Sequence, residues 1–442
     1  MKSSSDLFQL IKALTKSEKR YFKLFTALQK GEKNHLKLFN AVDKKKEYNE
    51  EEIRKALERE KFVQHLSKEK ERLYLMILKS LRMYNTGKSV NIAMKELMHN
   101  VKLLFDKGLY EKAVKELSKI KYLANKHEQF LTLLEIQEWE REIIHKRGQE
   151  VLKNKSFKMI EKETEEILMK YNNYLQYLQL NSQIFTEYRK ERLIRSNDFV
   201  NDTRFIQSEL FTINKPMSIR ANYLHHSMHG NYNLIEENYH NAHQHFSAAF
   251  QIYKSRPELV EQNFGEYFGA LRNMIIVASS LKKYNEGIEY IQELKSLEKK
   301  IPAQVNTELM RVRIFAVQYI YELDINIHMG NFARGLSIVP EIENGLMKYK
   351  NKMNTIHTTT LYYNISIVYF ANNNYSKSLF WLNKILNEPE IAIVPHMHYF
   401  SQMFNLIIHY ELDNMDLLEH IAKSTYRFLY KRNRLYKLES CI

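Results

Sequence analysis

The sequence predicts an almost entirely α-helical protein built from consecutive helical hairpins. A short signature recurs along it: Gly, Asn, Glu or Lys, then an aromatic residue two positions later, then a small residue three positions further on. The clearest copies are Gly108-Tyr110-Ala113, Glu237-Tyr239-Ala242, Lys282-Tyr284-Gly287, Gly330-Phe332-Gly335 and Asn373-Tyr375-Ser378. A signature repeated every 40 to 50 residues indicates stacked hairpins, because one hairpin cannot bury its apolar face alone.

Length and composition favour the same fold class. The chain has 442 residues, of which 44% are hydrophobic, so it can bury a core as two domains or as one elongated array. It contains only 11 Gly and 6 Pro, and every proline lies at or beyond Pro216. The first half therefore has few residues that interrupt long helices.

The sequence also favours the cytoplasm as the location of this protein. Its single cysteine, Cys441, excludes an intramolecular disulfide and fits a reducing compartment. Residues 2–6 are polar where a signal peptide would place its apolar segment. No apolar stretch reaches membrane-spanning length, so we expect neither export nor membrane insertion.

The net charge of +15 is concentrated at the two ends. Residues 1–90 hold 22 Lys and Arg against 12 Asp and Glu, and residues 421–442 hold 6 against 1, whereas residues 91–420 hold 39 of each. Basic ends attract an acidic partner through a field that salt would screen. The alternative is that Lys-rich helices only keep the protein in solution.

Residues 1–90 are predicted to form a basic helical module. Thr15 and Glu18 have the spacing of a capping box, which satisfies free amide groups at a helix start. The helix is expected to run through residue 30 and to pack through one face, formed by Tyr21, Leu24, Phe25 and Leu28. The other face carries a basic stripe of Lys16, Lys19, Arg20 and Lys23.

Two further helices complete this module. Asn49 and Glu52 repeat the capping signal ahead of a short helix that ends near residue 59. A longer helix follows, with apolar residues at Leu66, Leu73, Ile77 and Leu81, and Asn85-Thr86-Gly87 is expected to end it. The basic stripe beside these helices suits nucleic-acid phosphates, but it lacks the pattern of a repressor-type helix-turn-helix. Docking to another protein or capping of the array is the alternative role.

From residue 91 onward the signature resembles the tetratricopeptide repeat. The resemblance depends on a small residue three positions after the aromatic, a large apolar residue seven after it, and a small or apolar residue ten after it. The matches are Tyr239 with Ala242, Phe246, Ala249 and the preceding Gly230; Tyr110 with Ala113, Leu117 and Ile120; and Tyr375 with Ser378, Leu382, Ile385 and the preceding Ser366. The resemblance implies a right-handed α-solenoid in which small residues let paired helices approach closely.

The sequence departs from that family in its period. The aromatics at 110, 157, 199, 239, 284, 332 and 375 are 40 to 48 residues apart, whereas the family repeats about every 34 residues, so longer helices or loops are expected. Phe157 and Phe199 are assigned mainly by spacing, because Ile160 and Asp202 do not fit the small position. The stretch from Leu14 to Phe22 is also similar to the start of uncharacterised bacterial helical-repeat proteins.

The resemblance further implies a concave surface lined by the first helix of each hairpin. Counting back from each aromatic places six residues on it: Lys95, Lys102, Asn231, Arg272, Asp324 and Tyr363. A mixed polar lining of this kind suits an extended peptide or a partner helix. Longer helices would instead shift the register and place several of these residues on ordinary solvent faces.

A concentration of histidines raises the possibility of a metal site. These residues are His225, His226 and His229 on one expected helix and His240, His243 and His245 on the next. No neighbouring Cys or carboxylate completes a ligand set, and the register directs His226 and His229 toward the packing face of the hairpin. We therefore predict no metal site.

No motif indicates an enzyme or a cofactor. The glycines are too scattered for a phosphate-binding loop, and His127-Glu128 lacks the second histidine of a zinc-protease helix. The carboxylates between Glu161 and Glu166 alternate with Lys162 and are typical of a solvated helix face. We expect a non-catalytic protein without a cofactor.

Residues 421–442 are predicted to form a basic amphipathic helix. Its apolar face is formed by Ile421, Thr425, Phe428, Leu429, Leu435 and Tyr436. The basic face carries Lys423, Arg427, Lys431 and Arg434. We expect this helix to cap the last hairpin, because repeat arrays need shielded ends. A free face for another chain, a homodimer through this end and a shortened chain are the alternatives.

The sequence thus predicts a basic module (1–90), a tetratricopeptide-like array (91–420) and a capping helix (421–442). The expected function is that of a non-catalytic scaffold which binds a peptide or partner protein on the array, with an acidic partner favoured at the basic ends. The alternative is a regulator that binds nucleic acid through the basic module and uses the array as a sensor.

Overall fold

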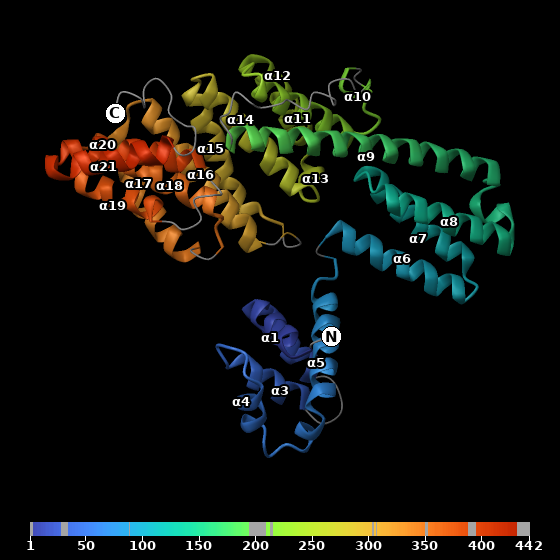
Figure 1. The fold of residues 1–442 in the computed structure, drawn as a ribbon. Coiled ribbons are helices and arrows are strands. Elements are labelled where there is room, and N and C mark those ends of the chain that lie inside the picture. Colours follow the sequence, from blue (N-terminus) through green and yellow to red (C-terminus); the bar gives the residue numbers. More distant parts are fainter. Residues whose placement is uncertain are drawn as a thin grey trace. The chain divides into compact units, whose positions relative to one another are not determined.

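The computed structural model describes residues 3–27, 34–87, 89–193, 209–212, 215–302, 305, 307–349, 352–387 and 395–430. Within these ranges all regular elements are helices, which confirms the predicted all-α class. The chain divides into two compact units, Met1–Leu103 and Leu104–Ile442. Figure 1 shows the helices of both units.

The N-terminal unit is a small helical bundle. Its elements are α1 (Ser3–Ala13), α2 (Lys16–Ala27), α3 (Asn34–Asp43), α4 (Glu50–Ala56), the 3-10 turn η1 (Lys61–His65) and α5 (Leu66–Tyr84). Helix α5 packs against α1, α2 and α3, and its buried residues include Leu66, Leu73 and Ile77. Helix α6 (Val90–Asp106) begins at the predicted boundary and crosses the division between the units.

The predicted helix starts and stop in this unit are confirmed. The Thr15 amide donates to a Glu18 carboxylate oxygen at 2.8 Å, and the Glu18 amide donates to Thr15 Oγ1 at 3.3 Å. Asn49 caps α4 by accepting from the Glu52 amide at 3.2 Å. Helix α5 ends at Tyr84, and Gly87 takes a left-handed φ of 71°. These capping signals involve residues only a few positions apart, so they can be predicted from the sequence alone.

The predicted packing face of α2 is wrong by part of a turn. Leu24 was expected in the core, yet it is 58% exposed, and Phe22 is buried in its place. The Phe22 ring packs against Phe39 of α3, with centroids 4.7 Å apart. Apolar residues lie on two neighbouring faces of this short helix. The contact with α3 determines which of the two faces is buried. Leu28, the last residue of the predicted face, lies outside the described residues.

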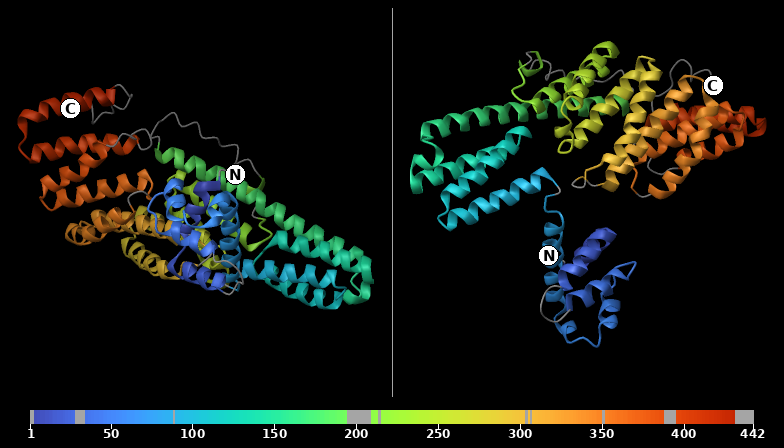
Figure 2. Two further views of the ribbon diagram at one scale, coloured as in Figure 1. Left: turned by 90° about the horizontal axis from the view of Figure 1, so that it is seen from below. Right: turned by 180° about the vertical axis from the view of Figure 1, so that it is seen from behind.

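The second unit continues as a succession of helices. These are α7 (Tyr110–Lys126), α8 (Phe130–Arg147), α9 (Phe157–Leu193), α10 (Glu209–Thr212), α11 (Ile219–Ile235), α12 (Tyr239–Lys254), α13 (Pro257–Val260), α14 (Phe264–Ser280), α15 (Tyr284–Leu297), α16 (Thr307–His328), α17 (Phe332–Tyr349), α18 (Thr355–Ala371), α19 (Tyr375–Leu386), α20 (Pro395–Glu411) and α21 (Met415–Tyr430). From α7 onward each long helix packs on the next, as Figure 2 shows from two further sides. Helix α14 also contacts α16, α16 contacts α18, and α18 contacts α20.

The corners between paired helices share one backbone geometry. In each corner a residue with φ between 50° and 72° lies two positions before the first residue of the next helix. At the end of α18, for example, Asn373 is left-handed; its amide donates to Phe370 O, and the Asn374 amide donates to Tyr369 O, both at 2.9 Å. This is the Schellman arrangement, which satisfies the last carbonyls of a helix. The corners of this kind are Gly108–Tyr110, Glu128–Phe130, Glu237–Tyr239, Lys282–Tyr284, Gly330–Phe332, Asn373–Tyr375 and Asp413–Met415.

The recurring signature is therefore a corner signal, and its five clearest copies are confirmed as helix starts. The small residue three positions later lies where two helices touch. Ala242 and Ser378 are fully buried, and a Cβ placed on Gly287 would come within 2.7 Å of Ile325. The corners at Glu128 and Asp413 do not match the signature. The first lacks the small residue, and the second lacks the aromatic.

Helix α9 departs from the predicted regular spacing. Phe157 begins a helix, as expected, but that helix runs without a break for 37 residues to Leu193. The spacing predicts that a second helix starts at Phe157 and another at Phe199, with a separate first helix between them; the continuous helix α9 takes the place of that separate helix and its connection. Neither Gly nor Pro occurs in α9, so nothing local stops the helix. Phe199 itself lies outside the described residues.

The last helix packs on its predecessor. Helix α21 contacts α20, with Thr425 buried and Ile421 half-buried at the contact side. Of the predicted apolar face, the side chains of Phe428 and Leu429 and the whole of Leu435 and Tyr436 lie outside the described part of the chain.

Candidate binding surface

The first helices of four consecutive hairpins bring distant residues together. Helices α14, α16 and α18 contact one another in sequence. Helix α11 joins them through Tyr223, whose hydroxyl donates to the backbone carbonyl of Glu266 on α14 at 3.0 Å. We call the side chains that these helices place together the first-helix surface, defined by Tyr223, Arg272, Arg313, Asp324, His357 and Tyr363.

Two arginines on this surface have no carboxylate partner among the described residues. The guanidinium of Arg272 donates to Asn273 Oδ1 at 2.9 and 3.3 Å and lies over the Phe185 ring, 5.9 Å from its centroid. Arg313 is exposed. Burial, together with the charges of Arg272 and Arg313, lowers the pKa of His357 to about 4. All three groups are therefore close enough to interact electrostatically, and the histidine is neutral at neutral pH.

A third arginine nearby is neutralised. Arg220 at the start of α11 lies 3.3 Å from a carboxylate oxygen of Glu266 and over the ring of Tyr174, 4.3 Å from its centroid. Tyr253 also donates to Glu266. Glu266 thus balances the charge of Arg220 inside the protein, although the buried Nε of Arg220 makes no hydrogen bond with a described residue. The positive charge available for binding is thus concentrated at Arg272 and Arg313.

Three of the residues predicted to line a groove occupy neighbouring first helices. Arg272, Asp324 and Tyr363 are half-buried on α14, α16 and α18. Asp324 accepts from Ser279 Oγ at 3.0 Å, which engages its carboxylate. The Tyr363 ring packs against Phe404, with centroids 6.0 Å apart, and burial raises the pKa of its hydroxyl.

The other three predicted groove residues are one buried residue and two residues of the N-terminal unit. Asn231 on α11 is only 3% exposed, so its assignment to an open surface is corrected. Lys95 and Lys102 are exposed on α6 and belong to the N-terminal unit.

Arg313 and His357 were missed by the sequence register. They lie 19 and 18 residues before Phe332 and Tyr375, upstream of Asp324 and Tyr363, the positions that were counted on these helices. Helix α16 has 22 residues and is longer than its neighbours α14 and α18. Counting back from each turn aromatic as far as the start of the preceding helix would have included both residues.

The predicted histidine group forms a compact cluster around the α11–α12 hairpin. His225, His226, His229 and His245 lie together: the Nδ1 atoms of His226 and His245 are 3.2 Å apart, and the ring of His229 stacks on His245 at 4.9 Å. Burial and the neighbouring imidazoles lower the pKa of His225 to about 3 and of His229 to about 4.

This cluster faces the interior of the hairpin. Tyr177 and Phe211 pack against its rings, and the described residues contain no group of three or more His, Cys, Asp or Glu placed to hold a metal ion. His240 takes no part in it, and His243 lies 3.8 Å from Glu286 instead.

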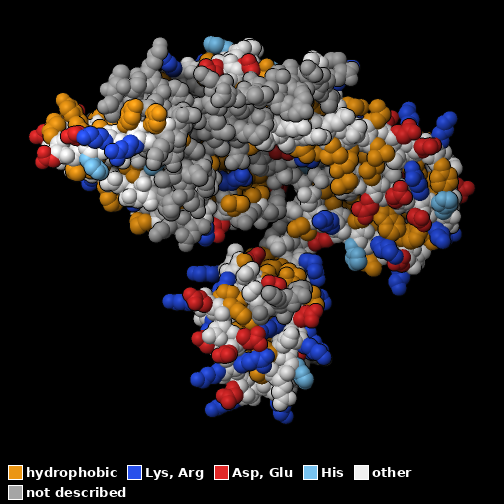
Figure 3. Space-filling view, in the orientation of Figure 1, with side chains coloured by type: hydrophobic (Ala, Val, Ile, Leu, Met, Phe, Trp, Pro, Cys, Tyr) orange, Lys and Arg blue, Asp and Glu red, His pale blue; other side chains and the backbone are white. Residues whose placement is uncertain are grey.

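The predicted basic patches remain largely on the surface. Lys16, Arg20 and Lys23 on α2 are exposed and make no ion pair with a described residue, whereas Lys19 pairs with Asp43 at 2.6 Å. Figure 3 shows Lys and Arg around the N-terminal unit, with Asp and Glu between them.

The basic residues of the C-terminal segment are divided between described and undescribed positions. On α21, Lys423 pairs with Glu419 and Arg427 is exposed. Lys431 and Arg434 lie outside the described residues.

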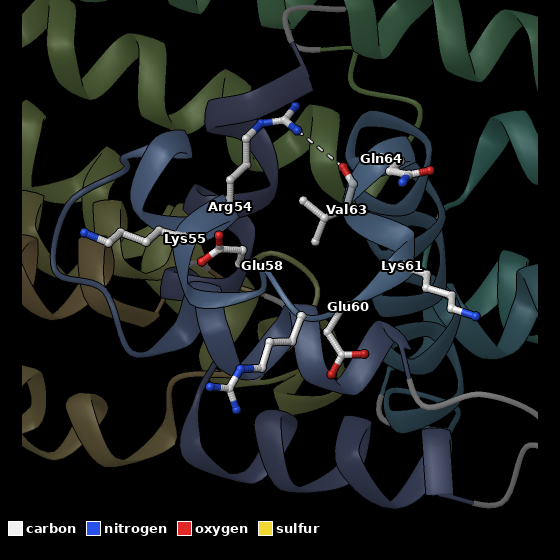
Figure 4. Close-up of a pocket in the computed structure, with 8 residues that line it drawn as sticks. Arg54, Lys55, Glu58, Glu60, Lys61, Val63 and Gln64 are labelled. Atoms are coloured by element: carbon white, nitrogen blue, oxygen red, sulfur yellow. Dashed lines mark hydrogen bonds between the residues drawn. The ribbon is translucent and has the colours of Figure 1, made fainter.

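A cavity of about 680 Å³ lies between α4 and η1 in the N-terminal unit. Its cations do not converge: Lys55 and Lys61 point in opposite directions in Figure 4. Arg54 is held by Glu50 at 2.9 Å and by the Val63 carbonyl at 3.3 Å. The cavity therefore lacks the directed charge of an anion site.

Comparisons with known proteins give no relative for this chain. No protein-family model matches it, and neither a curated protein nor a solved structure is significantly similar to it. None of the helices in the described ranges combines the length and apolar character needed to cross a membrane.

Proposed function

We propose that this chain is a non-catalytic scaffold of the cytoplasm that binds a peptide or partner protein on its first-helix surface. One observation carries the proposal: Arg272 and Arg313, from consecutive first helices, lack a carboxylate partner among the described residues. The neighbouring Arg220 has such a partner within 3.3 Å. A guanidinium left without an internal acid is well suited to a carboxylate from outside, because charge-assisted hydrogen bonds are short and strong.

The packing of the hairpins supports a display role. Each long helix of the second unit contacts the next, and small residues hold the paired helices close together. Arg272 and Arg313 are thereby fixed on helices and not on loops, which limits the entropy lost on binding. We interpret the second unit as a tetratricopeptide-like solenoid, in keeping with the resemblance of its corner signature.

A matched pair of charge reversals tests this function. Arg311 lies two residues from Arg313 on α16, on nearly the opposite side of the helix, and its nearest carboxylate is Glu298 at 3.9 Å. We expect proteins captured from the native cell by the full chain to be lost with Arg313→Glu and retained with Arg311→Glu. Identical partner sets for both variants and the wild type would exclude the proposed surface.

A second candidate function is nucleic-acid binding by the N-terminal unit. It is favoured by Lys16, Arg20 and Lys23, which stay exposed and free of ion pairs among the described residues. The affinity of the full chain for nucleic acid should then fall steeply with salt. Replacing the three cations by Glu should abolish binding. Binding that survives the triple replacement, or that does not respond to salt, would exclude this function.

A further inference from the structure

The register of the first-helix surface continues onto α20, where its chemistry changes. Arg272 and Tyr363 both lie 12 residues before the first residue of the following helix, and Asp324 lies 8 before it. The equivalent positions on α20 are Met403 and Ile407, which precede Met415 by 12 and 8 residues. Because α18 contacts α20, helices α14, α16, α18 and α20 form one row of contacting helices.

This part of α20 is an apolar stripe. Its members follow helical spacing of three, four and three residues: Phe400, Met403, Ile407 and Tyr410. Ile407 is 50% exposed and Tyr410 59% exposed, and Met403 is half-buried. Helix α20 contains no Lys, Arg or Asp, and Glu411 at its end is its only carboxylate. An exposed helix face without charge is typical of a binding surface.

Helix α18 provides the transition between the two chemistries. Near its start lies His357, close to the two arginines, and further along Tyr363 and Phe370 pack against Phe404 of α20. The surface therefore carries Arg272 and Arg313 over α14 and α16, where the carboxylate of Asp324 is engaged by Ser279, and it is aromatic over α18 and α20. Packed helices lie about 8–10 Å apart, so three steps from α14 to α20 cover about 30 Å. About nine residues of extended chain span that length.

We propose that the partner is a protein segment with acidic side chains at one end and large apolar side chains at the other. This inference rests on the proposed scaffold function and specifies its ligand. The acidic end would lie against Arg272 and Arg313, where charge complementarity fixes its position. The apolar end would cover Ile407 and Tyr410 and remove their exposed area from water. A second copy of this chain on the apolar stripe would leave the arginines unused, so it fits the surface less completely.

A random 12-residue peptide library displayed on phage and selected on the full chain tests this composition. We expect enriched peptides to carry Asp or Glu in one half and Leu, Ile, Phe, Trp or Tyr in the other. Selection on Arg313→Glu should lose the acidic enrichment and keep the apolar one. Selection on the double variant Ile407→Ser/Tyr410→Ser should do the reverse, and both side chains are exposed enough for the variant to fold.

Matched controls separate these effects from general damage. Arg311→Glu changes the same charge on α16, and Leu178→Ser changes a partly exposed apolar residue on α9; both should leave the enrichment unchanged. A selected peptide labelled with fluorescein should bind Arg313→Glu about tenfold more weakly, or worse, by anisotropy. Circular dichroism confirms that each variant keeps its helices.

The possible outcomes distinguish this inference from the function on which it rests. If no peptide is enriched, both fail. If peptides are enriched without the split composition, or if Arg313→Glu does not alter their composition, the scaffold function stands and this inference fails. Light scattering gives a third outcome: a dimer in solution that Ile407→Ser/Tyr410→Ser converts to a monomer assigns the apolar stripe to a second copy and overturns the inference.

Discussion

In the α11–α12 and α18–α19 hairpins, the two helices approach closely through different kinds of contact. Nine residues before the turn aromatic, the first has Gly230 and the second Ser366; three residues after it, they have Ala242 and Ser378. A Cβ on Gly230 would lie 2.3 Å from the Phe246 ring, so that hairpin closes through an apolar contact. In the other, the hydroxyls of Ser366 and Ser378 each donate to the other residue's backbone carbonyl at 2.8 Å.

The comparison shows that both hairpins need small residues where their helices touch. The contact itself can be apolar or hydrogen-bonded. Glycine gives the closest contact but contributes no side-chain hydrogen bond, so Phe246 fills the space. Serine is small enough for a slightly wider contact and satisfies its own polar group in the buried site. Both residues of the serine pair are fully buried.

The starts of the two first helices differ in a similar way. Asn354 caps α18 locally, accepting from the His357 amide at 2.8 Å. Ser218 caps α11 in the same manner, but the Ile219 and Arg220 amides also donate to the carboxylate of Glu128, at 2.7 and 2.9 Å. Glu128 lies in the corner between α7 and α8, so a tertiary contact stabilises this helix start.

The largest expected difference between the hairpins is their response to acid. The pKa values of His225 and His229 are lowered to about 3 and about 4 in the folded chain, while an unfolded histidine titrates near 6.5. Stability is therefore complete above pH 6.5 and declines as the pH falls below it, because the unfolded state binds protons first. For His225 the loss at pH 5 is on the order of 2 kcal/mol.

Hydrogen exchange at pH 7 and pH 5, corrected for intrinsic rates, would check this expectation. Protection should fall more in α11–α12 than in α18–α19, which contains one histidine with a lowered pKa, His357. The double variant His225→Leu/His229→Leu serves as the control and should flatten the response of α11–α12. Equal acid sensitivity in both hairpins would contradict the role of the cluster.

The next largest effect is expected from Gly230→Ala. The new methyl group would overlap Phe246, which is fully buried and cannot move aside, at a cost of about 1–3 kcal/mol. The higher helix propensity of Ala compared with Gly offsets at most about 1 kcal/mol of this cost. Urea unfolding should show the loss. Gly265→Ala on α14 is the matched control, since its Cβ meets nothing within 4 Å, and we expect it to be neutral or slightly stabilising.

Removing the tertiary contact at the start of α11 should have a smaller effect. Glu128→Ala deletes the carboxylate that accepts from two amides, and we expect a loss of about 1 kcal/mol. Asn354→Ala removes the local cap of α18 and should cost a similar amount. Exchange rates should rise in α8 as well as α11 for Glu128→Ala, but only in α18 for Asn354→Ala. Effects confined to α11 in the first variant would show that Glu128 does not connect the two hairpins.

The smallest effect is expected from the serine pair. Ser378→Ala removes one of the two reciprocal hydrogen bonds and leaves the Ser366 hydroxyl its carbonyl acceptor, so the cost should be about 1 kcal/mol. A double-mutant cycle with Ser366→Ala measures the coupling between the two residues. A coupling energy near zero would mean that the small size of these side chains matters and their hydrogen bonds do not.

Part of the candidate surface could be predicted from the sequence. Arg272, Asp324 and Tyr363 were found because their distance from the turn aromatic repeats along the chain. Arg313 and His357 were missed because both lie near the start of their helices, farther from the turn aromatic than the positions that were counted. Asn231 was assigned wrongly, since the register gives a residue's side of a helix but not what the neighbouring helix covers.

What the sequence by itself determined is the local structure: which segments are helical, where the capped helices begin, and where the chain turns. These features depend on backbone conformation and on hydrogen bonds between residues a few positions apart, as in the Thr15–Glu18 box and the left-handed corners.

Only the tertiary structure decided the burial of Phe22 in place of Leu24, the unbroken course of α9, and the meeting of Arg272, Arg313 and His357. Each of these results from contacts between residues far apart in the chain. The free energy of such a contact depends on the partner surface as much as on the residue itself.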